Sequence, residues 1–181
     1  INYFGRTFGR ESKNIIVRNV KIINGMGLSI GSEMSGNVSN VLIENIEIEN
    51  ILRVVYVKSE YGRGGHVKNI TYRNITAQNV RENVIELTMN YENLKSPTLK
   101  HNFDSSSNNN YNFLAMNETA IPKFDDIRIE NLFVNKTKNV FSFDGIRKLH
   151  NAKNDDKNPV ESSSSSSSYI KNIVLNNIQV N

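Results

Sequence analysis

Apolar and polar residues alternate in five similar segments of this chain, each interrupted at its middle by an asparagine. The segments are NIIVRNVKIIN (14–24), NVLIENIEIEN (40–50), NITYRNITAQN (69–79), DIRIENLFVNK (126–136) and NIVLNNIQVN (172–181). Alternation with period two predicts β-strands that bury one face. Val41 and Ile43 share such a face, and Ile46 and Ile48 lie on the other side of Asn45. The buried face continues past Asn45 only if the chain turns a corner there, and asparagine tolerates the left-handed backbone that such a corner requires.

A third short strand is predicted after four of these segments. These strands are GLSIGS (27–32), VVYVKS (54–59), VIELTM (84–89) and VFSFDG (140–145), with the expected inward residues Leu28, Ile30, Val55, Val57, Ile85, Leu87, Phe141 and Phe143. Three strands in a repeat of about 26 to 29 residues predict a parallel β-helix, because a single coil must stack on its neighbours to bury its apolar face. The leucine spacing of a leucine-rich repeat is absent. Since the corner recurs in each coil, the asparagine side chains are expected to stack into a ladder.

The chain is predicted to form one all-β solenoid over residues 1–181, with about five to six coils and asparagine corners. Residues 93–123 and 147–168 lack apolar periodicity, and the second of these segments ends in seven serines. We interpret both as loop insertions at coil corners. The first coil is expected to leave an open strand edge, and with it marginal solubility.

Composition narrows the classes of function. Lysine and arginine are interspersed with acidic residues at a net charge of +4, which disfavours a nucleic-acid footprint and is compatible with an acidic ligand. No apolar run approaches membrane-spanning length. The chain has no cysteine, and His66, His101 and His150 share no ligand spacing, so neither a thiolate nor a metal site is predicted. No cofactor is indicated, and the pattern leaves the oligomeric state open.

If the third strands stack in register, their outward residues form one face. These residues are Ser29, Gly31, Tyr56, Lys58, Glu86, Thr88, Ser142 and Asp144. A groove along such a face suits an extended polymer. Lys58 is the residue best able to hold a substrate carboxylate as a point charge. Tyr56 has two open interpretations, because an outward aromatic side chain in a solenoid can contact a sugar or simply cover its neighbours.

Two stretches carry a family resemblance: GMGLSIGSEMSGNVSNV (25–41) and RVVYVKSEYGRGGHVKNITYRN (53–74). Together they resemble the polygalacturonase family, the family 28 glycoside hydrolases, over about residues 5–80 and more loosely beyond. The resemblance implies a right-handed parallel β-helix, an acidic polysaccharide (galacturonan or pectin) as ligand, and secretion. It also implies inverting hydrolysis of α-1,4-galacturonan by aspartates, one acting as acid while others activate water.

The chain departs from the family pattern at the residues that carry chemistry. The resemblance places the family's Gly-His-Gly motif on residues 25–27, where Met26 stands in place of the histidine. It places the family's Arg-Ile-Lys motif on residues 56–58, where Tyr56 stands in place of the arginine and Lys58 is retained. The opening INYFGR resembles the segment after the family's Asp-Asp strand, so the catalytic aspartates would precede Ile1. We therefore expect a C-terminal portion that is inactive alone, with Lys58 and Tyr56 as substrate-binding residues and no catalytic residue.

Other charged residues receive structural interpretations. Asp125 and Asp126 form a pair, but Asp126 occupies a corner position and is expected to serve the fold. Glu33 and Glu60 are expected to cap turns, and Arg63 is expected in a turn or against a sugar. Two alternatives to the hydrolase stay open: a catalytically inactive pectin-binding solenoid, and a structural solenoid without a sugar ligand. Binding of polygalacturonate without turnover would favour the first, and no binding would favour the second.

Overall fold

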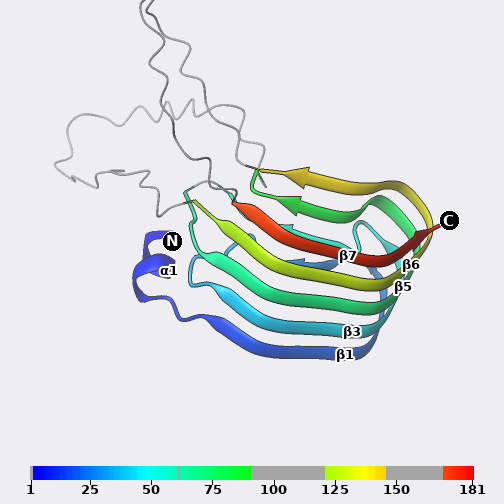
Figure 1. Ribbon diagram of the computed structural model, residues 1–181, viewed down its shortest axis with the longest axis horizontal. Coiled ribbons are helices and arrows are strands. Elements are labelled where there is room, and N and C mark those ends of the chain that lie inside the picture. The colour runs from blue at the N-terminus through cyan, green and yellow to red at the C-terminus, as the bar shows by residue number, and fades with distance from the viewer. Residues whose placement is uncertain (1, 61, 91–120, 146–168) are drawn as a thin grey trace, which may run out of the picture.

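The computed structural model describes residues 2–60, 62–90, 121–145 and 169–181, which form seven strands and one short helix. In chain order the elements are α1 (Asn2–Phe8), β1 (Ser12–Gly25), β2 (Leu28–Ile30), β3 (Val38–Ile51), β4 (Val55–Lys58), β5 (His66–Thr88), β6 (Lys123–Asp144) and β7 (Ile170–Val180). The strands lie one above another and curve around a shared interior, with α1 beside the edge of the stack where β1 and β3 begin (Figure 1). The chain pattern did not predict α1. The two predicted insertions fall almost wholly outside the described residues and stay predictions.

All strand pairs are parallel and join equivalent positions of successive repeats. β1, β3, β5, β6 and β7 pair in that order, while β2, β4 and the second halves of β5 and β6 form a second stack. Ile15, Val41, Ile70, Ile127 and Ile173 occupy one row across five strands. This register is that of a parallel β-helix and confirms the predicted fold class.

The asparagine corners are present where the alternation slips. Asn40, Asn45 and Asn50 have φ values of 53°, 55° and 57°, and the equivalent residues of the other coils are also left-handed. Their side chains form the expected ladder: Asn45 Nδ2 donates to Asn19 Oδ1 and Asn74 Nδ2 donates to Asn45 Oδ1, each at 3.2 Å. A left-handed corner absorbs the one-residue slip, so that both halves of the strand keep their apolar side chains on the inside.

The ladder changes at one aspartate. Asp126 has the corner conformation that its position predicts, with φ 50°. Asn172 of the next coil nevertheless donates to Asp125 Oδ1 at 2.8 Å, while Asp126 Oδ1 lies 3.2 Å from Arg128 Nη2. Asp126 therefore keeps the backbone role of the corner without the side-chain role.

The interior is aliphatic and buried in the middle coils. Apart from the partly buried Val38, the inward residues of β3, β4 and the first half of β5 are at most 6% exposed. Burial of each aliphatic side chain of this size contributes about 1.5–3 kcal/mol, so stacking between coils supplies most of the stability. Tyr72 is fully buried in this interior, and its hydroxyl has no hydrogen-bond partner among the described residues.

The two ends of the stack are less covered. Ile15 and Val20 of β1 are 39% and 37% exposed, as expected for an open first edge. Phe141 and Phe143 share rows with the buried Ile85 and Leu87, but they are 46% and 50% exposed. Their inward register was predicted and their exposure was not. The physical reason is that no strand of the described part of the chain stacks on this half of β6.

Candidate functional site

The outward residues of β2, β4 and the second halves of β5 and β6 lie in register, as the pattern predicted, except Gly31, which lies in the turn after β2. Ser29 of β2 pairs with Tyr56 of β4, which pairs with Glu86 of β5, which pairs with Ser142 of β6. A second row contains Lys58 of β4, Thr88 of β5 and Asp144 of β6. We call these seven residues the third-strand face. Neighbouring strands lie about 4.8 Å apart, so a ligand along the stack would meet one coil after another.

Lys58 lies half-buried at the end of β4, directly beside the turn that follows β2. Gly31 in that turn has φ +91°, and a Cβ atom there would overlap the Lys58 carbonyl oxygen. Only glycine combines this conformation with so close a backbone approach. The glycine therefore sets the position of the Lys58 backbone against the preceding coil.

Tyr56 lies on the third-strand face, yet only 4% of it is exposed. Its neighbours Val55 and Val57 point into the interior, whereas the Tyr56 ring is covered from outside by two cations. The Arg53 Cζ atom lies 4.5 Å and the Lys58 Nζ atom 4.8 Å from the ring centroid. Both distances are in the range of cation–π attraction. The assignment of Tyr56 as a sugar ligand stays a prediction, since little of its ring is open to solvent in this arrangement.

Arg53 is the residue of this region that the chain pattern did not reveal. Its Nε donates to Glu86 Oε2 at 2.5 Å, its Nη2 forms an ion pair with Glu82, and Asn83 Nδ2 donates to the same Glu86 oxygen at 2.6 Å. Burial lowers the pKa of Arg53, but the hydrogen bond and the charges of Glu86 and Glu82 outweigh it and raise the pKa above its ordinary value. The carboxylate of Glu86, a candidate groove residue by its position, is thus engaged by Arg53.

Met26 lies just before β2 and is 53% exposed. Its carbonyl oxygen accepts a hydrogen bond from the Arg53 backbone N–H at 3.2 Å. The position that the resemblance assigns to a histidine is therefore adjacent to the third-strand face. A thioether there can neither donate nor accept a proton.

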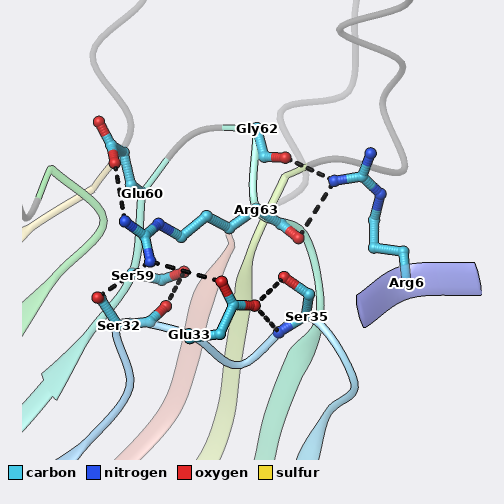
Figure 2. A network of polar contacts seen from close by, with 8 residues as sticks. All are labelled: Arg6, Ser32, Glu33, Ser35, Ser59, Glu60, Gly62 and Arg63. Carbon is cyan, nitrogen blue, oxygen red and sulfur yellow. Dashed lines mark hydrogen bonds and ion pairs between the residues drawn. The ribbon is translucent and has the colours of Figure 1, made fainter. Parts of the chain in front are cut away.

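Arg63 joins the turns that follow β2 and β4 (Figure 2). Its Nη1 donates to Ser32 Oγ at 3.1 Å and lies 3.7 Å from Glu33 Oε2, and its Nη2 lies 3.4 Å from Glu60 Oε2. Glu33 in turn accepts a hydrogen bond from Ser35 Oγ at 2.6 Å. The three charged side chains thus tie two successive turns together, in agreement with the turn roles predicted for them.

The helix α1 is attached to the same turns. Arg6 Nη1 donates to the carbonyl oxygens of Gly62 and Arg63 at 2.5 Å and 3.3 Å (Figure 2). Two arginine side chains therefore hold the turns after β2 and β4: Arg63 links the two turns, and Arg6 links the second turn to α1. None of these contacts arranges a nucleophile beside a base.

Asp125 belongs to a separate cluster at the start of β6. Its Oδ2 lies 3.2 Å from Lys171 Nζ and 3.8 Å from His66 Nε2. Burial opposes ionisation, but hydrogen bonds from Asn172 and Lys171 prevail and lower the pKa of Asp125. Burial also lowers the pKa of His66 below its ordinary value. Asp125 is thus an ionised partner of a lysine at neutral pH, which is the wrong state for a general acid.

The described residues provide neither a metal-binding cluster nor a membrane-spanning helix. Within the described residues, no three histidine, cysteine, aspartate or glutamate side chains form a group that could hold a metal ion. The same residues contain no helix that is long and apolar enough to span a bilayer.

The fold and the face define a parallel β-helix with charged and polar residues along one stack of short strands. Comparison with known families extends this result: the profile described as Glycosyl hydrolases family 28 matches residues 8–106, more than half of the chain. The chain belongs to this family.

Curated relatives include polygalacturonase 2 of Penicillium olsonii, which is 42% identical over 77 residues, or 41% of this chain and 20% of that protein. A polygalacturonase of Ralstonia nicotianae is 36% identical over 42% of this chain and 15% of its own length. A probable polygalacturonase of Vitis vinifera is 31% identical over 43% and 16%. The chain thus spans a fifth or less of the length of each of these relatives.

Proposed function

We propose that the third-strand face binds an acidic polysaccharide of the galacturonan type, and that Lys58 receives a uronate carboxylate. The observation that carries the proposal is the placement of Lys58 in a row of outward residues that crosses successive coils. A lysine ammonium is a compact cation that suits a single carboxylate. The relatives named polygalacturonase supply the sugar class, and through them the proposal extends to a secreted, pectin-degrading glycoside hydrolase.

We propose further that the 181 residues alone bind this ligand without cleaving it. Inverting hydrolysis needs one protonated and one ionised carboxyl across the sugar. The resemblance assigns no catalytic aspartate to this chain, Glu86 is engaged by Arg53, and Asp125 is paired with Lys171. Met26 and Tyr56 stand where the resemblance expects a histidine and an arginine, which favours binding over turnover.

Isothermal titration calorimetry with trigalacturonate tests the proposal. Wild type should bind, Lys58→Gln should weaken binding about tenfold or more, and affinity should fall with added salt because a charge pair is screened. Lys68→Gln is the matched control: it removes the same charge from an exposed lysine that lies outside the third-strand face, and it should bind like wild type.

Three results would decide among the alternatives. Equal affinity of Lys58→Gln and wild type would refute the role of Lys58. Release of reducing ends from polygalacturonate by the purified chain would refute the inactive state. Failure of wild type to bind any galacturonate oligomer would leave a structural solenoid as the better description.

A further inference from the structure

The direction of the Lys58 side chain is restrained by a neighbouring aromatic ring. A lysine side chain has four rotatable bonds and loses that freedom when it binds a ligand. The Lys58 ammonium already lies 4.8 Å from the centre of the Tyr56 ring, two residues earlier on the same side of β4. Cation–π attraction at this distance favours one direction of the side chain.

Tyr56 itself is fixed from several sides. Val55 and Val57 are fully buried, so they anchor β4 in the interior. In the strand register Tyr56 pairs with Ser29 of β2 on one side and with Glu86 of β5 on the other. The Arg53 guanidinium lies 4.5 Å from the ring centroid. With 4% of the residue exposed, the ring has little surface left with which to stack on a sugar.

Arg53 is in turn committed to carboxylates of the next coil. Its side chain is 16% exposed and that of Glu86 is 12% exposed, and the two are joined at 2.5 Å. Glu82 takes a second nitrogen of the same guanidinium, and Asn83 supports Glu86. An arginine compensated by two glutamates is a poor receptor for an acidic sugar, because its charge is already neutralised.

We propose that Tyr56 is a positioning residue that directs the Lys58 ammonium along the third-strand face, and that Arg53, anchored by Glu86, holds the Tyr56 ring in place. The proposal rests on the proposed function only for the identity of the ligand. Its consequence is preorganisation: a uronate carboxylate meets an ammonium whose direction is set before binding. The ring, and not the phenol hydroxyl, carries this role.

The proposal predicts a spectroscopic signature that does not require a ligand. Protons of the Lys58 ε-methylene near the face of an aromatic ring experience a ring current and resonate upfield of those of an exposed lysine such as Lys68. Wild type and Tyr56→Phe should both show this shift, and Tyr56→Leu should lose it. Arg53→Gln should reduce it, since the ring loses its outer support.

Binding of trigalacturonate to the same variants gives the second readout. Tyr56→Phe should bind within about twofold of wild type, and Tyr56→Leu should bind about three- to tenfold more weakly, the range of one cation–π contact. Circular dichroism and the thermal midpoint of each variant show whether it is folded. Because Tyr56→Phe preserves the ring shape, the test survives even if Tyr56→Leu fails to fold.

Two results would overturn the positioning role. The first is an unshifted Lys58 ε-methylene in folded wild type. The second is an equal loss of affinity in Tyr56→Phe and Tyr56→Leu, which would make the hydroxyl a sugar ligand. If no galacturonate oligomer binds, the proposed function fails, and the ring-current shift alone decides whether Tyr56 directs Lys58.

Discussion

The corner at Asn45 allows the contribution of backbone conformation to be separated from that of the asparagine ladder. Its side chain makes two ladder hydrogen bonds of 3.2 Å, and its φ is 55°. Both bonds are exposed, so together they contribute about 1 kcal/mol. The left-handed conformation costs alanine about 1–2 kcal/mol, whereas glycine adopts it freely and asparagine offsets the cost through hydrogen bonds of its short side chain.

Asn45→Ala is therefore expected to destabilise the chain by about 2–3 kcal/mol, from the lost bonds plus the backbone cost. Asn45→Gly loses the same bonds and gains freedom in the unfolded chain, which together cost about 1–2 kcal/mol. The glycine variant should be the more stable of the two by about 1 kcal/mol. This order is the reverse of that expected inside a regular strand, where glycine is the weaker residue.

Urea unfolding followed by circular dichroism measures the three free energies of unfolding. Asn135→Ala is the control: it removes an exposed asparagine of β6 whose φ is not positive, and it should cost less than about 0.5 kcal/mol. An alanine variant at Asn45 as stable as the glycine variant would show that left-handed backbone is not what the corner requires.

Three further predictions concern single residues. Tyr72→Phe should be neutral or stabilising by up to about 1–2 kcal/mol in thermal unfolding, because the buried hydroxyl has no partner in the described part of the chain; a clear loss of stability would reveal a partner for it. Gly31→Ala should abolish folding, because its Cβ would overlap the Lys58 carbonyl oxygen. Gly62→Ala is the control: its Cβ meets no described atom within 4 Å, so only the φ of +92° is unfavourable. Equal yields of soluble protein from the two variants would contradict this. Burial lowers the pKa of His66 in the folded chain, so protonation favours unfolding and stability should fall as pH drops below about 6.5. His66→Gln should lose less stability between pH 7 and pH 5 in urea titrations, and an identical pH dependence in both proteins would refute this assignment.

The repeat made the fold predictable. The alternation of Val41, Ile43, Ile46 and Ile48 around Asn45 contains both the strand faces and the corner between them, and all four aliphatic residues are buried. Local residue preference and tertiary packing agree at each such corner, so the pattern in the chain carries the three-dimensional register.

The candidate site was predictable in outline only. The register of the short strands placed Tyr56 and Lys58 on one face, as period-two alternation requires. The cover over Tyr56 was not predictable, because it depends on Arg53 reaching Glu86 of another coil. Phe143 is exposed because no strand in the described part of the chain stacks on it, and alternation within one strand does not encode what the next coil covers.

A titration with trigalacturonate followed by backbone amide NMR tests most directly whether the third-strand face is the ligand-binding surface. Amides of Ser29, Lys58 and Thr88 should shift together and saturate, and Lys58→Gln should suppress these shifts. Saturable shifts confined to the long strands β1 and β7, or none up to about 5 mM ligand, where a site of millimolar Kd would be mostly filled, would contradict it.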